Sequence, residues 1–359
     1  MAQRLNMAMI QAARGAAVFL VMLFHASQIG QQYYGYNFLG ISGMGRSGAY
    51  TFFFVLTGYI MYSLYWHKFA QGHLFATFLL KRFYRIYPLY WLIMAAIIPV
   101  YFMMPSFGLG FERQPSAIFK SLLLWPQTHE PILVVTWSLS FVVLFYIVFS
   151  LGFLLKEKVL IAIYSSWATI IVLNLFGLIQ LKDRVLIQFV FSQYNLPFIV
   201  GIVVAVISRR MPPKLGIGWM GGGIAMYAAL WAVRYETTSV PYIDLMHTAG
   251  SAMLLVGIAV WQGKNMRGLK LLEVLGNASY SILLASLPAM SILFKLARAA
   301  RLSEWIGAAG TIAVCFVAAL GLCVLFYRWV ERPLYQKLRH MLPQPKDKPA
   351  GAVVRPSPR

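Results

Sequence analysis

Arg14 and His25 are the first residues in this sequence whose types and spacing suggest chemistry. Both lie in one apolar run, QAARGAAVFLVMLFHAS, from Gln11 to Ser27. On an α-helix they would lie about 16 Å apart, with Arg14 near one membrane surface and His25 inside the hydrocarbon. An ionisable side chain at that depth costs several kcal/mol unless it faces a cavity or a polar partner, so His25 is a candidate functional residue. The alternatives are a core histidine bonded to a neighbouring helix and an interfacial arginine that snorkels to the surface.

The composition predicts an integral membrane protein around this run. Of the 359 residues, 60% are hydrophobic and only 11% are charged, whereas about a quarter of a soluble domain is charged. Apolar windows of about 20 residues predict an all-α, single-domain membrane protein with about ten transmembrane helices. The predicted spans are 9–28, 48–66, 86–104, 132–154, 159–180, 187–208, 216–233, 246–262, 276–294 and 306–328.

The basic residues predict the orientation of these spans. The net charge of +21 falls in short clusters between apolar runs, which indicates attraction to the membrane surface rather than binding of nucleic acid. With the N-terminus in the cytoplasm, 22 of the 31 Lys and Arg residues fall on the cytoplasmic side, as the positive-inside rule requires. We therefore expect both termini in the cytoplasm.

A change in composition near residue 342 divides the chain into a membrane domain, residues 1–341, and a tail, residues 342–359. The tail is Pro-rich and basic without apolar periodicity, which predicts a disordered cytoplasmic extension near anionic lipid. Cys315 and Cys323 lie in one apolar segment and fit neither a metal site nor a disulfide framework. We expect no metal.

Several stretches together resemble the acyltransferase-3 family of multi-pass membrane enzymes, which O-acylate sugars, often on bacterial exopolysaccharides. The spacing RGAAVFLVMLFH is similar to the first transmembrane helix of that family. The further matches, in order, are FFFVLTGYIM (52–61), KRFYRIYPLYW (81–91), LGNASYSILL (275–284) and YRWVERPL (327–334). The resemblance covers nearly the whole chain.

The resemblance implies roles for the ionisable residues. His25 matches the position held responsible for catalysis and would act as general base, and Arg14 matches its partner arginine. The basic cluster Lys81, Arg82 and Arg85 would bind the phosphates of an acyl-coenzyme A such as acetyl-coenzyme A, the acyl donor, from the cytoplasm. The same cluster is also typical of a topology anchor.

The resemblance also indicates residues that could line a sugar or acyl pocket, although packing alone explains them. Trp137 and Tyr146 resemble the family's WSL…FY segment, and Tyr280 and Ser281 resemble its SYS segment. Glu331, between Arg328 and Arg332, could pair locally or reach across to the basic cluster. An ion pair of this kind is structural.

Three departures from the family's pattern concern the partner of His25. Thr51 and Val142 stand where the family commonly carries acids, and Ser286 stands where it carries a second histidine. The predicted spans hold no deeply placed acid that would orient His25. We consider His247 as a substitute, and the carboxylates of Asp244 and Glu130 as groups that could approach from the outer side. His247 is also a candidate for the substrate pocket.

Two functions follow from the resemblance. The first is a carbohydrate O-acyltransferase in the inner membrane of a bacterium, moving an acyl group, most simply acetyl, from coenzyme A to a glycan hydroxyl, on a lipid-linked carbohydrate or another. The second is a non-catalytic scaffold or transport partner in polysaccharide export. Both place the protein in a lipid bilayer beside the polysaccharide biosynthesis or export machinery.

Overall fold

The computed structural model describes residues 7–42, 47–181, 184–233, 242–261 and 268–341, and every regular element in these ranges is helical. The tail predicted for residues 342–359 lies outside the described residues. The helices are α1 Met7–Tyr34, α2 Tyr50–Tyr65, α3 Leu74–Met103, α4 Pro115–Leu122, α5 Trp137–Ser150, α6 Glu157–Leu175, α7 Val185–Val190, α8 Leu196–Ile207, α9 Gly216–Val233, α10 Ile243–Val260, α11 Lys270–Asn277, α12 Ser279–Ala299, α13 Leu302–Phe326 and α14 Arg332–Met341.

Short turns of tighter or wider helix join these elements. A five-residue π-helix, η9 Tyr327–Glu331, connects α13 to α14. The 3-10 turns are η1 Phe38–Gly40, η2 Trp66–Lys68, η3 Pro105–Phe107, η4 Phe111–Arg113, η5 Val134–Thr136, η6 Leu151–Phe153, η7 Gln193–Asn195 and η8 Pro213–Leu215. Such turns end or redirect a helix where its last carbonyl groups would otherwise lack partners.

The prediction of an all-α, multi-pass membrane protein is confirmed. Nine helices among the described residues are long and apolar enough to cross a membrane. The predicted span 48–66 corresponds to α2, which has only 16 residues and is therefore about 24 Å long, shorter than the roughly 30 Å hydrocarbon layer. It lies inside the bundle rather than at its surface, because Phe52, Phe54 and Val55 are almost completely buried.

The helix that carries the third predicted span, 86–104, begins well before the span does. Helix α3 begins at Leu74 and continues through Pro88 and Pro99 to Met103. The two prolines therefore lie inside the helix, where neighbouring helices can satisfy the carbonyl groups that proline leaves without a donor. The basic cluster at 81–85 consequently lies inside α3 rather than at its entrance.

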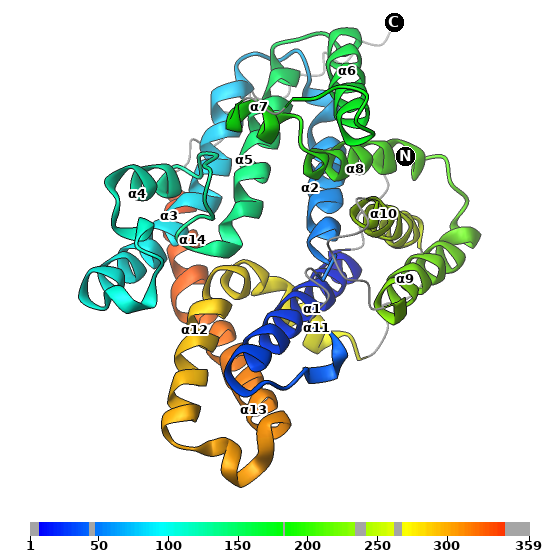
Figure 1. Cartoon of the computed structure of the whole chain (residues 1–359). Helices are drawn as coiled ribbons and strands as arrows, with labels where there is room; N and C mark the ends of the chain where they lie inside the picture. The colour runs from blue at the N-terminus through cyan, green and yellow to red at the C-terminus, as the bar shows by residue number, and fades with distance from the viewer. Residues whose placement is uncertain (1–6, 43–46, 182–183, 234–241, 262–267, 342–359) are drawn as a thin grey trace, which may run out of the picture.

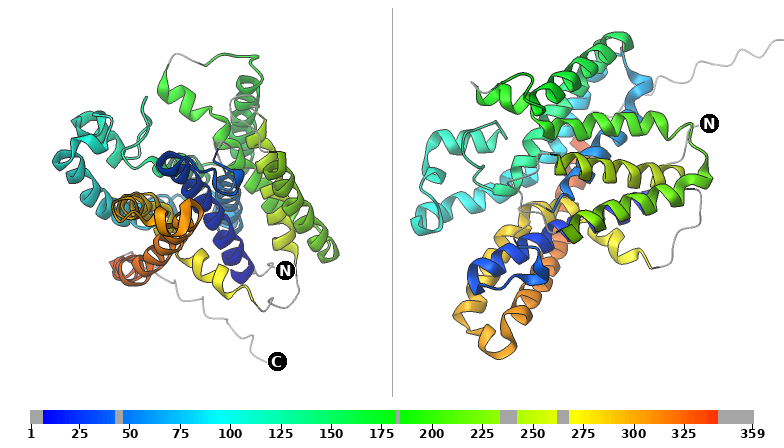
Figure 2. Two further views of the ribbon diagram at one scale, coloured as in Figure 1. Left: turned by 60° about the horizontal axis from the view of Figure 1, so that its bottom comes forward. Right: turned by 45° about the vertical axis from the view of Figure 1, so that its right-hand side comes forward.

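The helices pack in pairs and small groups (Figure 1). Helix α1 lies against α11 and α12, α12 pairs with α13, α2 pairs with α8, and α9 pairs with α10. The two further views show α9 and α10 side by side and α12 and α13 as a hairpin (Figure 2). Aromatic rings fill the interior between α2, α5 and α8, where Phe54 and Phe145 both stack on Phe198, with ring centroids 4.5 and 4.7 Å away.

Glycine allows α1 and α11 to meet at backbone distance. A Cβ added to Gly15 would collide with the carbonyl oxygen of Leu272, and one added to Gly276 would collide with the carbonyl oxygen of Gln11. Such small-residue contacts are typical of membrane helices, because close backbone approach increases van der Waals contact where lipid gives no hydrophobic driving force. The contact places the start of α12 beside Arg14.

We expect Gly276→Ala to destabilise the protein by roughly 1–3 kcal/mol, because the added methyl group forces α11 away from α1. The measurement is the thermal unfolding midpoint of the purified protein in detergent. Gly221→Ala in α9 is the matched control, since a Cβ there meets no atom within 4 Å. Equal midpoints for the two variants would contradict this account of the contact.

Candidate active site

A cavity of about 800 Å³ passes between α1, α2, α3, α5 and α12 and extends to the segments 125–131 and 185–194. Arg14 and His25 both line it. Eleven helical residues correspond to three turns, so the two side chains leave α1 on nearly the same face, about 16 Å apart along the axis. The first helix thus presents both of its ionisable groups to one space.

The cavity has two ends that differ in chemistry. We call the part lined by Arg14 and Arg85 the arginine end, and the part lined by His25, Tyr50 and Trp137 the histidine end. Helix α5 spans the distance between the two. Its first residue, Trp137, packs its ring 5.2 Å from that of Tyr50, whereas Tyr146, about 14 Å further along, lies at the arginine end.

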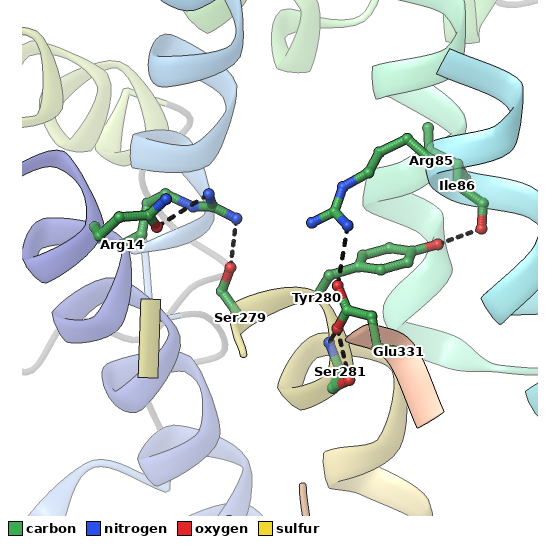
Figure 3. Close-up of polar contacts among 8 residues, drawn as sticks. Arg14, Arg85, Ile86, Ser279, Tyr280, Ser281 and Glu331 are labelled. Carbon is green, nitrogen blue, oxygen red and sulfur yellow. Dashed lines mark hydrogen bonds and ion pairs between the residues drawn. The ribbon is translucent and has the colours of Figure 1, made fainter. Parts of the chain in front are cut away.

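Hydrogen bonds hold the guanidinium of Arg14 in place (Figure 3). It donates to the side-chain oxygen of Gln11 at 3.2 Å and to the hydroxyl oxygen of Ser279 at 2.6 Å. Ser279 is the first residue of α12, and the break at Ala278 turns it toward α1. Arg14 is therefore a positioned cation at the cavity wall.

Gln28 is the hydrogen-bond partner of His25. The Nδ1 atom of His25 lies 3.4 Å from the side-chain oxygen of Gln28, one turn further along α1, and both residues line the cavity. With the proton on Nδ1, the imidazole donates to the amide oxygen and keeps the lone pair of Nε2 for a substrate. The partner that the described residues give to His25 is therefore an amide and not an acid.

Arg85 and Arg82 of the basic cluster lie in different environments. Arg85 lines the cavity and forms an ion pair with Glu331, with nitrogen and oxygen 3.1 Å apart. Arg82 instead lies over the rings of Tyr65, Phe78 and Tyr146, at 5.2–5.6 Å from their centroids. Neither Arg82 nor Lys81 is among the described residues that line the cavity, so Arg85 alone of the cluster reaches it.

Glu331 connects α3 to the start of α12. Its carboxylate is 3% exposed and accepts bonds from Arg85, from the backbone N–H of Ser281 at 3.1 Å and from the Ser281 hydroxyl at 2.6 Å. A carboxylate at a helix N-terminus is also favoured by the helix dipole. Of the pairings considered from the sequence, the structure shows the one across to the basic cluster.

Of the residues predicted to line a pocket from α5 and α12, three line the cavity and Ser281 does not. Trp137, Tyr146 and Tyr280 line the cavity, and the Tyr280 hydroxyl donates to the backbone carbonyl of Ile86 at 2.6 Å. Ser281 is directed to Glu331 instead and is not among the cavity-lining residues. Its hydroxyl is consequently structural.

His247 lies elsewhere in the fold. It is completely buried in α10, its Nδ1 atom lies 3.0 Å from the carbonyl oxygen of Ile243, and its ring packs 5.3 Å from that of Tyr227. Because it is absent from the described cavity wall, the structure does not bring it to His25. The expectation that it lines the substrate pocket or substitutes for the missing acid has no support in this geometry.

The three residues that depart from the family's pattern, Thr51, Val142 and Ser286, lie in different parts of the fold. Thr51 is buried in a hydroxyl cluster, 2.8 Å from the Ser251 hydroxyl and 3.0 Å from the Tyr227 hydroxyl. Val142 lines the cavity with an apolar surface, and Ser286 is buried in α12. None of the three supplies an acid or an imidazole to the site.

The carboxylates of Asp244 and Glu130, which were predicted on the outer side, lie at or next to the cavity. Asp244 accepts a 2.5 Å bond from the hydroxyl of Tyr50, a cavity residue, and a 3.2 Å bond from Gln193. Glu130 lines the cavity itself. Gln28 and Tyr50 line the cavity as well, although neither was predicted from the sequence. Gln28 could have been found from its position one helical turn after His25, on the same face of α1.

Comparison with known proteins agrees with this geometry. The sequence profile of the acyltransferase domain family, acyltransferase-3, matches residues 8–328. The chain belongs to the acyltransferase-3 family. It is also 27% identical over 336 residues to the exopolysaccharide production protein ExoZ of Rhizobium meliloti, an alignment that covers 89% of this chain and 96% of that protein. No solved structure matches the chain.

The family assignment and the helices together show a multi-pass membrane acyltransferase. In this acyltransferase-3 protein, the matched region contains α1 with both of its ionisable residues, the basic cluster of α3 and the start of α12. Within the described residues no group of three or more His, Cys, Asp or Glu side chains is arranged to hold a metal ion.

We expect Glu331→Leu to lower the stability of this acyltransferase-3 protein by roughly 3 kcal/mol, because it leaves Arg85 without its partner and the start of α12 without an acceptor. Adding Arg85→Met should recover part of the loss. Thermal unfolding of the two single variants and the double variant gives the coupling energy.

The matched control is Glu304→Leu. Glu304 forms an exposed ion pair with Arg301 at 3.9 Å, and pairs of this kind contribute about 0–1 kcal/mol. A Glu331→Leu protein no less stable than the control variant would show that the buried pair does not hold α3 to α12.

Proposed function

We propose that the protein transfers an acyl group, most simply acetyl, from coenzyme A to a carbohydrate hydroxyl during exopolysaccharide production. The observation that carries the proposal is that one cavity is lined by two arginines at one end and by His25 at the other. In this proposal the arginine end faces the cytoplasm of a bacterial cell, both termini are cytoplasmic, and the histidine end lies toward the outer side of the inner membrane.

The arginine end has the chemistry that an acyl-coenzyme A needs. Arg14 and Arg85 approach from opposite walls (Figure 3) and both line the cavity. A guanidinium can bind phosphate oxygens through two parallel N–H groups. The polyanionic donor would bind here, and its long, flexible pantetheine arm would carry the thioester toward His25.

The histidine end supports the transfer itself. His25 removes the proton from the acceptor hydroxyl through Nε2, while Gln28 holds Nδ1–H. The hydroxyl oxygen then attacks the thioester carbonyl carbon, a C–O bond forms, and the tetrahedral intermediate collapses with cleavage of the C–S bond. The sulfur leaves as thiolate and takes up the proton from the imidazolium, so the products are the ester and free coenzyme A.

The name of the relative supports the acceptor class. The Rhizobium meliloti protein is an exopolysaccharide production protein and aligns over nearly its full length with this chain. Aromatic and amide side chains at the histidine end of the cavity suit a carbohydrate, because such a pocket needs apolar surface with a few directed polar groups.

We expect His25→Ala to reduce acyl transfer per folded molecule by 10²–10⁴-fold, the range typical for loss of a general base. The assay follows radiolabelled acetyl from acetyl-coenzyme A into the glycan fraction of membranes that contain the protein. His247→Ala is the matched control, since this histidine is also buried but lies outside the described cavity wall. It should lower stability while turnover per folded molecule is maintained.

A folded His25→Ala protein that esterifies glycan at the wild-type rate would rule out this mechanism. If deletion of the gene leaves the ester content of the host's surface glycans unchanged but stops export of the polymer, the scaffold function is correct instead. Recovery of both the protein and the ester content has to be measured in the same cells.

We expect Arg85→Gln to raise the KM for acetyl-coenzyme A by 10–100-fold, because a charge-assisted contact to phosphate contributes about 1.5–3 kcal/mol. Lys81→Gln should leave that KM nearly unchanged, since Lys81 lies outside the described cavity wall. The pair of variants removes one positive charge each, four residues apart, so a general effect of charge at the membrane surface would change both.

The sidedness of the donor site is tested with sealed vesicles. Acetyl-coenzyme A does not cross membranes, so inside-out vesicles should transfer acetyl to glycan and right-side-out vesicles should not until they are permeabilised. Equal activity of sealed right-side-out vesicles would contradict the proposed orientation.

Equal KM values for acetyl-coenzyme A in Arg85→Gln and Lys81→Gln would contradict the role of Arg85.

A further inference from the structure

Residues 125–131, WPQTHEP, form a connection between α4 and α5 that the proposed chemistry does not yet use. Their approach to α3 is fixed by hydrogen bonds to three consecutive backbone carbonyls. Tyr90 donates to Ser121 at 2.5 Å, Trp91 to Leu122 at 2.9 Å and Tyr87 to Leu123 at 3.1 Å. The following segment is therefore held against α3 rather than free over the membrane surface.

A buried hydroxyl fixes the other side of this segment. The Ser121 hydroxyl oxygen accepts bonds from the side chain of Gln127 at 3.2 Å and from the backbone N–H of Ile132 at 3.3 Å. Ser121 is only 1% exposed. Because Gln127 and the residue that follows the segment are both bonded to Ser121, the path of the segment is restrained, which reduces the entropy that binding must lose.

All seven residues of the segment line the same cavity as His25. They supply a large ring on Trp125, an amide on Gln127 and a carboxylate on Glu130. The amide oxygen of Gln127 is buried without a hydrogen-bond partner among the described residues, which is unusual because buried polar atoms are nearly always paired. Gln127 therefore has hydrogen-bonding capacity at this wall that the described residues do not use.

A second part of the cavity wall has the same character. Gln188 of α7 and the residues Ser192 and Tyr194 after it also line the cavity. The ring of Tyr194 lies 5.3 Å from that of Trp137, so this wall continues into the start of α5. Amide, hydroxyl and aromatic groups thus border the cavity from two separate connections of the chain.

This polar border lies at the histidine end. Trp137 begins α5 soon after the segment ends and contacts Tyr50, whose hydroxyl donates to Asp244. Ile243, the neighbour of Asp244, packs in one cluster with Phe24, the neighbour of His25. The segment therefore leads into the start of α5, which lies on the same side of the bundle as His25.

We infer that residues 125–131 form the binding subsite for the carbohydrate acceptor, with Trp125 as a stacking surface for the apolar face of a sugar ring and Glu130 and Gln127 as partners for its hydroxyl groups. The inference rests on the proposed function and adds to it the place where the acceptor binds. A sugar suits this wall better than a lipid chain, because each sugar hydroxyl needs hydrogen-bond partners that these side chains offer.

The test uses the full-length protein in nanodiscs, acetyl-coenzyme A, and oligosaccharide fragments of the host's exopolysaccharide from which mild alkali has removed all esters. We expect Trp125→Ala and Glu130→Gln each to raise the KM for these fragments at least tenfold. The KM for acetyl-coenzyme A and the slow hydrolysis of acetyl-coenzyme A without fragments should stay within twofold of wild type.

Two matched controls carry the same substitutions outside the cavity. Trp305→Ala and Glu304→Gln change side chains that are highly exposed at the start of α13, and they should leave both KM values unchanged. Size-exclusion profiles in detergent show that each variant is folded, and a Trp125→Phe variant that keeps part of the fragment affinity separates stacking from folding.

The outcomes distinguish the two proposals. If wild type transfers acetyl but Trp125→Ala and Glu130→Gln have the same KM for the fragments as the Trp305→Ala and Glu304→Gln controls, the subsite is overturned. The proposed function then stands. A rise in both KM values by the same factor also overturns it, because a distorted cavity rather than a lost sugar contact would explain that result. If wild type transfers no acetyl to the fragments, the proposed function itself fails and the subsite with it.

Discussion

A charge inside a membrane needs a partner, and this constraint governs the arrangement of the bundle. Glu331 is almost completely buried, yet its carboxylate is shared between the guanidinium of Arg85 and two donors of Ser281. Arg14 is likewise bonded to Gln11 and Ser279. Because each buried charge is held by a different helix, satisfying the charges also fixes the walls of the cavity.

The start of α12 is where these constraints meet. Three consecutive residues there connect to three other elements: Ser279 to Arg14 of α1, Tyr280 to the carbonyl of Ile86 in α3, and Ser281 to Glu331 of η9. For all three bonds to form, α12 must begin at a fixed position and in a fixed direction. The glycine contact between α11 and α1 and the break before α12 provide both.

Hydropathy predicted most of the fold, because a segment that crosses a bilayer must be apolar over its whole length. It failed where local composition misled. The three cations at 81–85 delayed the predicted start of α3, although the helix begins at Leu74. The short α2 was predicted as an ordinary span, yet its 16 residues are stabilised mainly by neighbouring helices. Length and neighbours are tertiary properties that a window of sequence does not contain.

Only the part of the site that lies on a single helix could be predicted from the sequence. The spacing of Arg14 and His25 places both on one face of α1 and needs no tertiary information. The basic cluster is different, because Arg82 leaves α3 about 100° around the axis from Lys81 and lies among the aromatic rings near α5. Which of three neighbouring cations reaches a cavity depends on helices that are distant in the sequence. The approach of Asp244 to Tyr50 and of Glu130 to the cavity depends on distant contacts in the same way.

The amide beside His25 has a consequence for the proposed chemistry. A carboxylate at Nδ1 would stabilise the imidazolium after it takes the hydroxyl proton, whereas Gln28 accepts a hydrogen bond but carries no charge. The charged ring is then less stabilised, so the proton should pass on quickly to the departing thiolate. The thiolate must therefore leave within reach of Nε2. An acyl donor bound by its phosphates at the arginine end can meet that requirement only if its thioester extends along the cavity to His25, and this is why both ends have to belong to one continuous space.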